Sequence, residues 1–553
     1  MRTYNPSTQW QPDVHAYLQH SLGRESFMRT SKALCLPPKK LAVRVNTMRI
    51  KPDEASHKLQ RELKLQHAPT APYSSLPYLL ILPGQGPFDV DYANLCGPPG
   101  AREVVVNRAA GEAILKGADV YVPGVLAASA NLAAGDLCAV SCALELPGSN
   151  WTGINRGQVL RPPSPGAKNV SGSEAPDGEG LPRKRSKKNA MPATVDRRNL
   201  HLGAGRLQMG RKEMFRAQQG LALKMEHRIY DIPACNGIMR GEIMMQALPS
   251  VVAAAALDPQ PGMRVLDMCA APGGKATLLA QLMGGQGTVI ALDRTQPKIE
   301  RIQSLAADLG LSDCVRAIRM DATMAAGPLG HLSSSLSLKY SQGDGFLGGK
   351  LQEGDPSSRQ DSACEAGNAG SQGDFGTSCS TREEAKGGPI GTEVAHTSHD
   401  HSNEGPFEAE SFDAVLLDPP CSALGIRPRL THSWSLQQML SLGRYQRQLL
   451  AAAIRLLKPG GRMVYCTCTI NPAENEANVR FALDRWGHWL QLEPVAVPGI
   501  SAQPGLVGTD PATGEGWLSP GEANFVHRYD PADEHNDCIG FFISSFTKTR
   551  SMR

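Results

Sequence analysis

The sequence predicts an α/β protein whose C-terminal half is built on a doubly wound parallel sheet, with a smaller β-rich barrel upstream. From about residue 241, apolar runs alternate with helical patterns, and the runs are nearly continuous, as in strands buried on both faces. Between residues 97 and 212 the apolar runs are shorter and are separated by glycines, which is typical of a small barrel. Parallel strands joined by helices place their connecting loops along one edge of the sheet, where ligands bind.

The predicted sheet is assembled from strand and helix segments in chain order. Helical patterns follow the first two apolar runs and precede the fifth, as expected for helices that connect parallel strands. The runs are "MRVLDMC", "TVIALD", "VRAIRMD", "FDAVLLD", "RMVYCTCTI" and "CIGFFISSF".

The first 240 residues carry shorter elements. "LAVRVNTMRI" (residues 41–50) predicts a strand within residues 1–96, and "PDEASHKLQREL" after it predicts an amphipathic helix. The barrel is expected from residues 111–129 and 135–142, followed by a strand and a helix in "LHLGAGRLQMGRKEMF". Residues 213–240 are interpreted as a connection to the large sheet.

Two segments low in apolar residues are expected to be disordered. The first, at about residues 162–197, carries a basic cluster that is open to interpretation as a solvated loop, an RNA-contacting arm or a nuclear import signal: Arg183, Lys184, Arg185, Lys187 and Lys188. The second, at about residues 325–410, separates two strands that should be neighbours. It contains His396, His399 and His401, but a polar loop has no element to fix their geometry, so we predict no metal site.

The composition indicates the cellular compartment of the protein more clearly than it indicates a binding partner. A net charge of +4 over 553 residues neither requires nor excludes nucleic acid. The N-terminus "MRTYNPSTQWQPDV" lacks the apolar core of a signal peptide, and no run of about 18 apolar residues predicts a membrane span. Thirteen cysteines without a secretion signal predict reduced thiols in the cytoplasm or the nucleus.

The segment "DMCAAPGGKA" is a candidate cofactor loop, because it follows a predicted strand and opens a helix with unpaired N–H groups. A phosphate loop needs Lys followed by Ser or Thr, whereas Lys275 is followed by Ala276, and the turn lacks a Gly-x-Gly-x-x-Gly fingerprint. Three acids end successive strands: Asp293, Asp321 and Asp418. Asp293 lies about 20 residues after the loop, where a carboxylate accepts hydrogen bonds from ribose hydroxyls. Together these features favour a nucleoside cofactor such as S-adenosylmethionine.

Cysteines follow two apolar runs at this same predicted edge. Cys421 comes after Asp418-Pro419-Pro420, where an aromatic residue would favour methylation of an amino nitrogen and a cysteine favours covalent chemistry. Cys466 and Cys468 alternate along one strand, so both should face the same side. Cys468 is nearer the strand end and is the better candidate nucleophile, with Cys466 left open. The next helix is predicted to begin at the capping residues Asn471, Pro472 and Glu474.

Thiols in this position suit methyl transfer to C5 of cytosine, a poor nucleophile. Addition of a thiolate to C6 activates C5 toward an electrophilic methyl group. A free thiol has a pKa near 8.5, so the site must favour the thiolate, and a carboxyl group bonded to N3 would stabilise charge on the ring. After transfer, the C5 proton leaves and the thiol is eliminated.

The segments "DMCAAPGGKAT", "FDAVLLDPPCSALGIRPR" and "YCTCTINPAENE" resemble the motifs of the Sun-domain RNA cytosine-5 methyltransferases. The resemblance covers about residues 220–550 without the insertion, and it implies a Rossmann-like, S-adenosylmethionine-dependent methyltransferase domain over residues 241–553. "LAVRVNT" resembles the family's N-terminal RNA-recognition-like region, and "ILKGADVYVPGV" followed by "AGDLCAV" resembles a PUA domain. That combination points to the PUA-containing, tRNA-acting branch, the sixth member of the family.

The resemblance also implies roles for individual residues. Cys468 would be the nucleophile, Cys421 would help to release the product, and Asp418 would also face the cytosine. The implied cofactor-binding residues are Cys269, Ala270, Ala271, Pro272, Gly273, Gly274, Lys275, Asp293, Asp321 and Asp418. Two positions depart from the family pattern, since Ala423 replaces a glycine and Cys466 replaces a small residue such as serine.

The implied partner is tRNA, bound by a monomer that does not associate with membranes. The resemblance implies that the target is an acceptor-stem cytosine, position 72, and the low cost of unstacking a base near a frayed helix end fits such a target. The PUA domain would hold the single-stranded 3′ end. Four arginines are candidates for phosphate contacts, although part of this charge is expected to be solvated: Arg427, Arg429, Arg444 and Arg447. An amino-nitrogen methyltransferase and a non-catalytic RNA-binding protein remain as alternatives.

Overall fold

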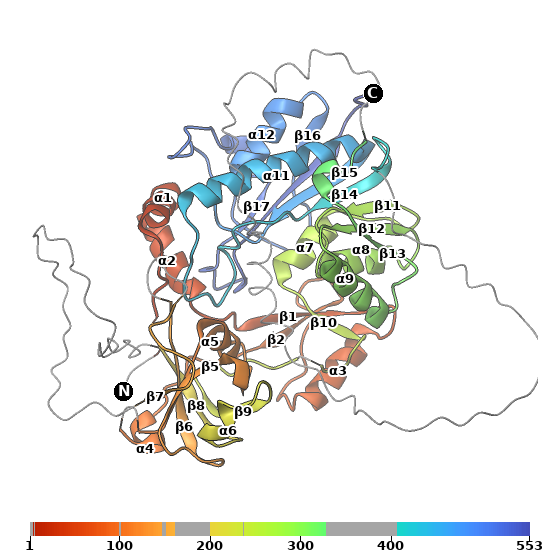
Figure 1. Ribbon diagram of the computed structural model, residues 1–553. Helices are drawn as coiled ribbons and strands as arrows, with labels where there is room; N and C mark the ends of the chain where they lie inside the picture. Colours follow the sequence, from red (N-terminus) through yellow and green to blue (C-terminus); the bar gives the residue numbers. More distant parts are fainter. Residues whose placement is uncertain are drawn as a thin grey trace, which may run out of the picture.

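The computed structural model describes residues 4, 6–98, 101–145, 151–160, 200–235, 237–327 and 406–553. Figure 1 shows its three sheets, with the large sheet at the top, the seven-stranded sheet at the lower left and the three-stranded sheet below the large one. The basic cluster at residues 183–188 and the three histidines at 396, 399 and 401 lie outside the described residues. Within those ranges, no helix is long and apolar enough to cross a membrane, and no cluster of His, Cys, Asp or Glu side chains could hold a metal ion.

The eight-stranded sheet confirms the predicted α/β fold, although it is mixed rather than wholly parallel. Its order is β13-β12-β11-β14-β15-β18-β16, with β17 paired to β18. Strands β11 to β15 are parallel, whereas β18 runs antiparallel to β15 and β16. The C-terminal end of β16 lies beside the middle of β18, so β18 begins beyond that end of β16 and runs in the direction opposite to it. The strands are β11 (Arg264–Asp267), β12 (Thr288–Asp293), β13 (Val315–Arg319), β14 (Phe412–Leu417), β15 (Leu457–Thr467), β16 (Leu490–Glu493), β17 (His527–Tyr529) and β18 (Phe541–Lys548).

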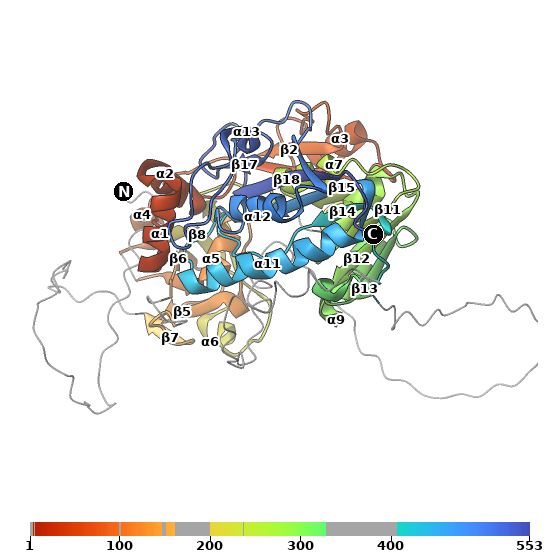
Figure 2. The same ribbon diagram turned by 90° about the horizontal axis from the view of Figure 1, so that it is seen from above.

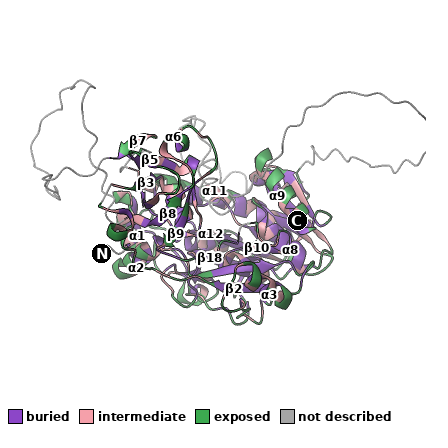
Figure 3. Ribbon diagram, turned by 90° about the horizontal axis from the view of Figure 1, so that it is seen from below, coloured by how far each residue is buried: buried purple, intermediate pink, exposed green. Residues whose placement is uncertain are grey.

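Helices cover both faces of this sheet. Successive strand residues point to opposite faces, so Leu416 and Val464 pack with α7, α8 and α9, whereas Val415 and Met463 pack with α11 and α12. Figure 2 shows α11 lying along one face, and Figure 3 shows buried residues along the strands and exposed residues on the outer helices. The helices are α7 (Leu248–Ala256), α8 (Gly274–Leu282), α9 (Gln296–Leu309), η2 (Ala322–Met324), α11 (Leu436–Leu456), α12 (Glu476–Trp486) and α13 (Pro520–Ala523).

The N-terminal residues pack against the large sheet through two separate groups of elements. The predicted strand and helix are present as β1 and α3, and β1 lies between β2 and β10 in the three-stranded sheet. Helices α1 and α2 pack on the first turns of α11 through a shared apolar cluster. The elements are α1 (Pro12–Leu22), α2 (Arg24–Leu34), β1 (Lys40–Val45), α3 (Pro52–Glu62), β2 (Leu79–Pro83) and β10 (Ile243–Met245).

The β-rich region forms a seven-stranded sheet in the order β4-β9-β8-β6-β3-β5-β7. Residues 213–240, expected as a connection, contribute β9 between β4 and β8. Residues 111–115, expected within the β-rich barrel, belong to α5, because the Asn107 side chain caps that helix by accepting from Ala110 N. The elements are α4 (Tyr92–Cys96), β3 (Glu103–Val106), α5 (Arg108–Leu115), β4 (Val120–Tyr121), η1 (Val122–Gly124), β5 (Val125–Ser129), β6 (Leu137–Cys142), β7 (Gln158–Leu160), β8 (His201–Leu207), α6 (Arg211–Met214) and β9 (Leu221–Arg228).

Candidate active site

The structure brings two predicted thiols into contact. Strands β14 and β15 are parallel neighbours, so the loops that follow them leave the sheet at the same edge. Cys421 lies in the loop after β14, Cys468 lies one residue beyond β15, and their Sγ atoms are 3.4 Å apart. Cys421 is buried and Cys468 is partly exposed. A substrate entering from this edge therefore reaches Cys468 first.

The contact between the two sulfurs affects the protonation of Cys421. The hydrogen bond with Cys468 and burial together raise the pKa of Cys421 well above the ordinary value of a thiol. Cys421 therefore keeps its proton at neutral pH, and in this neutral form its S–H can donate to Cys468 Sγ. Only a thiolate is a strong sulfur nucleophile, so Cys421 is poorly suited to attack in this state.

The other candidate nucleophile, Cys466, is placed away from Cys421. It lies within β15, opposite Ile543 of β18, and is fully buried in the core on the α7 side of the sheet. Burial raises its pKa well above the ordinary value, with Asp418 as the next cause. Cys466 therefore behaves as a small core residue.

The predicted cofactor loop connects β11 to α8 at the same edge of the sheet. Gly273 has a left-handed backbone (φ +109°) and immediately precedes α8, whose first turn has no side-chain cap within the described residues. The N–H groups in the first turn of α8 therefore remain directed toward the loop. The loop residues Cys269, Ala270, Ala271 and Pro272 run alongside Asp293, whose carboxylate accepts a hydrogen bond from Ala271 N at 3.3 Å.

The strand-end acids differ in their surroundings. Asp293 ends β12, and Lys298 Nζ lies 3.6 Å from its carboxylate. Asp321 caps η2 by accepting from Thr323 N at 3.0 Å and Thr323 Oγ1 at 2.7 Å. One oxygen of the Asp321 carboxylate, Oδ1, is therefore engaged by its own turn, and the other, Oδ2, lies 3.6 Å from Arg294 Nε.

The third acid, Asp418, forms an ion pair with Lys275 of the cofactor loop, a contact that sequence reasoning did not predict. Burial alone would lower the pKa of Lys275, but the Asp418 carboxylate raises it above the ordinary value. Lys275 therefore stays positively charged. The pair joins the loop after β14 to the first turn of α8, and it places a fixed positive charge near the Cys466 thiol.

Sequence reasoning missed Asp267, the last residue of β11. Its side chain is buried, and neither carboxylate oxygen has a hydrogen bond of normal geometry within the described residues. Burial raises the pKa of Asp267 to about 7, against a lowering effect from Lys275. Asp267 also ends a strand, directly before the cofactor loop, so the rule that selected Asp293 could have selected it.

A buried network behind the thiols was also missed. The sequence predicts a helix start at Asn471, Pro472 and Glu474, but α12 begins at Glu476 and those residues form a turn before it. Glu474 turns inward and binds Ser422 and Asn471 instead of the helix end. The spacing alone is typical of a cap, and only the neighbouring loop from β14 explains the inward turn.

Three of the four arginines proposed for phosphate contacts form hydrogen bonds or ion pairs within the protein. Arg427 is buried and donates to Asp537, Cys538 O, Ala33 O and Leu36 O. Arg429 lies 3.8 Å from Glu112, and Arg447 is paired with Glu515. Arg444 is exposed on α11 and remains available to a ligand.

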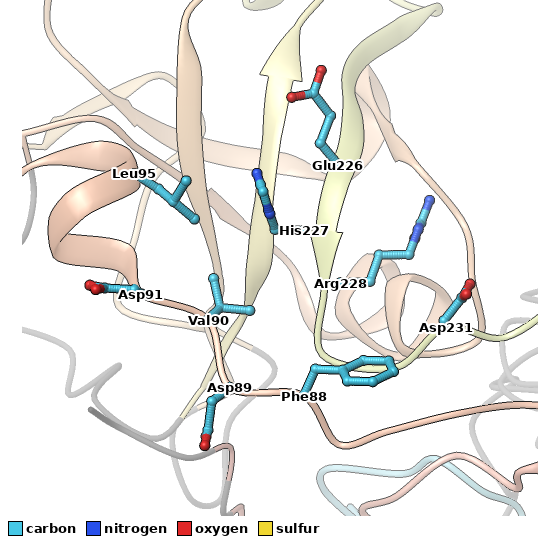
Figure 4. A pocket seen from close by; sticks show the side chains of 9 residues that line it. All are labelled: Phe88, Asp89, Val90, Asp91, Leu95, Glu226, His227, Arg228 and Asp231. Atoms are coloured by element: carbon cyan, nitrogen blue, oxygen red, sulfur yellow. The ribbon is translucent and has the colours of Figure 1, made fainter.

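A separate groove of about 460 Å³ lies in the β-rich region, between residues 88–95 and β9. Figure 4 shows acidic and basic side chains around it: Asp89, Asp91, Glu226, His227, Arg228 and Asp231. None of the candidate site residues lines this groove. The chemistry indicated by the sequence is therefore located at the large sheet.

The residues at that edge fit S-adenosylmethionine. The loop supplies backbone N–H groups, Asp293 supplies a carboxylate at the ribose position of the fold, and the unsatisfied Asp267 favours a ligand that brings hydrogen-bond donors or positive charge. Cys269 lies among these acids, where burial and the charge of Asp293 raise its pKa, so it stays a neutral thiol.

Known proteins share this organisation. The model of the 16S rRNA methyltransferase RsmB/F family matches residues 254–331 and 390–547, and the PUA domain model matches residues 102–141. An rRNA (cytosine-C(5))-methyltransferase, NOP2C of Arabidopsis thaliana, is 36% identical over 98% of this chain and 91% of its own length. The tRNA (cytosine(72)-C(5))-methyltransferase NSUN6 of Mus musculus is 31% identical over 99% and 98%.

A solved structure is similar over almost the whole chain. The crystal structure of NSun6 from Pyrococcus horikoshii, determined with the S-adenosylmethionine analogue SFG, has a TM-score of 0.63 and 25% identity, covering 98% of this chain and 99% of that one. These matches confirm the predicted fold, the PUA domain and the cofactor. The chain belongs to the RsmB/F family of S-adenosylmethionine-dependent RNA cytosine-C5 methyltransferases.

Proposed function

We propose that this protein methylates C5 of cytosine 72 in the acceptor stem of specific tRNAs, through a covalent bond between Cys468 and the base. The observation that carries the proposal is the sulfur pair, with Cys421 and Cys468 3.4 Å apart beside the cofactor loop. The name and near-complete coverage of the mouse relative support the tRNA target. The Arabidopsis relative is more similar in sequence and is named for rRNA, which makes rRNA the second candidate substrate.

In the proposed reaction, Cys468 attacks as a thiolate. Its Sγ bonds to C6 of the flipped cytosine, and the electron pair of the C5–C6 double bond becomes available at C5, which takes the methyl group. S-adenosylmethionine, when bound, supplies that methyl group from a sulfonium sulfur. We place the base so that its exocyclic amino group donates to the Asp418 carboxylate, while the positive charge of the paired Lys275 offsets the negative charge that develops on the ring.

Release requires the second sulfur. Once Cys468 is bonded to carbon, it no longer accepts the hydrogen bond that is the largest cause of the raised pKa of Cys421. Cys421 then loses its proton to water and, as a thiolate, accepts the C5 proton. The C5–H electron pair restores the C5–C6 double bond, and the C6–S electron pair returns to Cys468. The resting pair is thereby regenerated.

RNA binding is assigned to two regions. The PUA domain holds the single-stranded 3′ end, and exposed cations such as Arg444 of α11 contact phosphates. Phosphate contacts release counterions, so affinity is expected to fall as salt rises.

The test is methylation of RNA that carries tritium at C5 of its cytosines. Methylation at C5 releases one tritium to water for each methyl group incorporated, whereas methylation of an amino nitrogen releases none. A tRNA with uridine at position 72 is the matched control and is expected to accept no methyl group. Tritium release from an rRNA transcript, with none from tRNA, would show that rRNA is the substrate. Methyl incorporation without release would contradict the C5 chemistry.

A further inference from the structure

We propose that Glu474 is a positioning residue that clamps the Cys421 loop to the Cys468 loop and thereby controls release of the methylated RNA. The inference rests on the proposed covalent mechanism and adds a residue that sequence reasoning placed at a helix cap. Its basis is a buried hydrogen-bond network that connects the residues immediately following the two cysteines.

The carboxylate of Glu474 is fully buried and is shared between the two loops. Oε1 accepts from Ser422 Oγ at 2.5 Å and from Asn471 Nδ2 at 2.8 Å. Oε2 accepts from Ser422 N at 2.9 Å and from Gln446 Nε2 at 2.9 Å. Each oxygen therefore holds one bond to Ser422, the residue that follows Cys421.

The same network reaches the residue that follows Cys468. Ser422 Oγ lies 2.7 Å from Thr469 Oγ1, and Gly425 N donates to Cys468 O at 3.0 Å. Ser422 and Thr469 are both buried, so these bonds are shielded from water. The two loops are consequently joined one residue beyond each sulfur, with Glu474 as the acceptor on which the donors converge.

The two chemical steps need this clamp to different degrees. Attack on C6 requires Cys468 and the base. Release also requires the Cys421 sulfur at the C5 proton while Cys468 is still bonded to C6. Because C5 and C6 are bonded neighbours, the two sulfurs must be held close together at that stage. A loosened Cys421 loop should therefore slow release before it slows attack, and the covalent adduct should accumulate.

The test is Glu474→Gln in the full chain, incubated with tRNA and S-adenosylmethionine and analysed on a denaturing gel. An amide in either orientation turns an NH2 group toward one pair of donors, so it loses either the bonds from Ser422 N and Gln446 Nε2 or the bond from Asn471 Nδ2. The share of RNA bound covalently at steady state should rise about tenfold over wild type, as expected for the loss of one charge-assisted hydrogen bond from the release step. Ser422→Ala keeps the hydrogen bond from Ser422 N to Glu474, so it should give a smaller increase in covalently bound RNA. It provides the test of the inference if Glu474→Gln does not fold.

The matched control is Glu476→Gln. Glu476 is equally buried two residues along, but it pairs with Arg528 at 2.7 Å and accepts from Leu506 N at 3.0 Å. Glu476→Gln should destabilise the protein without increasing the share of RNA bound covalently. An equal increase for both glutamate variants would overturn the inference, because general loosening would then explain the result.

Cys421→Ala separates this inference from the proposed function. If Cys421→Ala accumulates adduct while Glu474→Gln and Ser422→Ala do not, the positioning role is refuted and the covalent mechanism stands. If Cys421→Ala accumulates none while methylation of RNA continues, the covalent mechanism fails, and the role of Glu474 in release fails with it.

Discussion

At the residue scale, the site depends on pairs of side chains that no local pattern contains. Cys421, Cys468 and Gly273 were predictable, because each is tied to a strand end or a turn. The Lys275–Asp418 ion pair and the inward turn of Glu474 were not, because both contacts join segments from different parts of the chain. Sequence position indicates where a side chain leaves the backbone, whereas its partner depends on the packed fold.

Asp267 gives a pH-dependent prediction. Its pKa of about 7 in the folded protein exceeds the unfolded value of about 3.9, so the folded state binds an extra proton between these values. The contribution of this group to the free energy of unfolding should fall as pH rises from about 4 to 7, by up to about 1.4 kcal/mol per pH unit. In urea titrations, Asp267→Asn should therefore gain stability relative to wild type as pH rises from 5 to 7. The exposed Asp258→Asn is the control, and a difference for Asp267→Asn that does not change with pH would contradict the assignment.

At the element scale, the ends of parallel strands collect the site, and this was the most predictable feature. Strands β11, β12, β14 and β15 carry the cofactor loop, Asp293 and both thiols to one edge. Element boundaries were less predictable. The turn before α12 has the composition of a cap, and α5 has enough apolar residues to resemble a strand.

The contact between β1 and α8 gives a prediction about the cofactor loop. Arg44 of β1 is fully buried and donates to Gly274 O at 2.8 Å, Gln246 Oε1 at 3.1 Å and Thr277 Oγ1 at 3.0 Å. Burial lowers its pKa to about 10, so it remains charged at neutral pH. Arg44→Met removes these bonds and should lower the free energy of unfolding by about 3 kcal/mol.

Because Gly274 begins α8, Arg44→Met should also weaken S-adenosylmethionine binding, measured by calorimetry on the folded fraction. The control is Arg240→Met, which removes an exposed ion pair with Asp308 and should change stability by less than about 1 kcal/mol. Equal losses for the two variants would refute the bracing role of Arg44.

At the scale of the whole molecule, the α/β fold and the β-rich region were predictable from periodicity, but the pairing between distant segments was not. Strand β10 pairs with β1, although most of the N-terminal half of the chain lies between them in sequence. Strand β9 is the last strand in sequence of the sheet whose first strand is β3. Such pairings depend on tertiary contacts, so local patterns indicate the strands without their partners. Residues 213–240 were expected to be a connection for this reason.

Deletion of residues 330–405 tests how the large sheet depends on the predicted insertion. The flanking residues meet in the fold, since Gly327 N donates to Phe407 O at 3.0 Å and Phe407 N donates to Ala325 O at 2.7 Å. A short Gly/Ser linker should therefore keep both stability and methylation close to wild type. Extending the deletion through Phe407, whose ring packs 5.2 Å from that of Phe412, should lower the melting temperature. Loss of folding or of methylation in the shorter deletion would contradict this prediction.

The central claim is that Cys468 attacks the base and Cys421 releases it. Its most direct test is a denaturing gel of Cys421→Ala incubated with tRNA and S-adenosylmethionine. We expect a slowly migrating band in which RNA is linked to protein, and we expect it to disappear when Cys468 is also replaced by alanine. Methylated tRNA without such a band, or a band that persists in the double variant, would contradict the assigned roles.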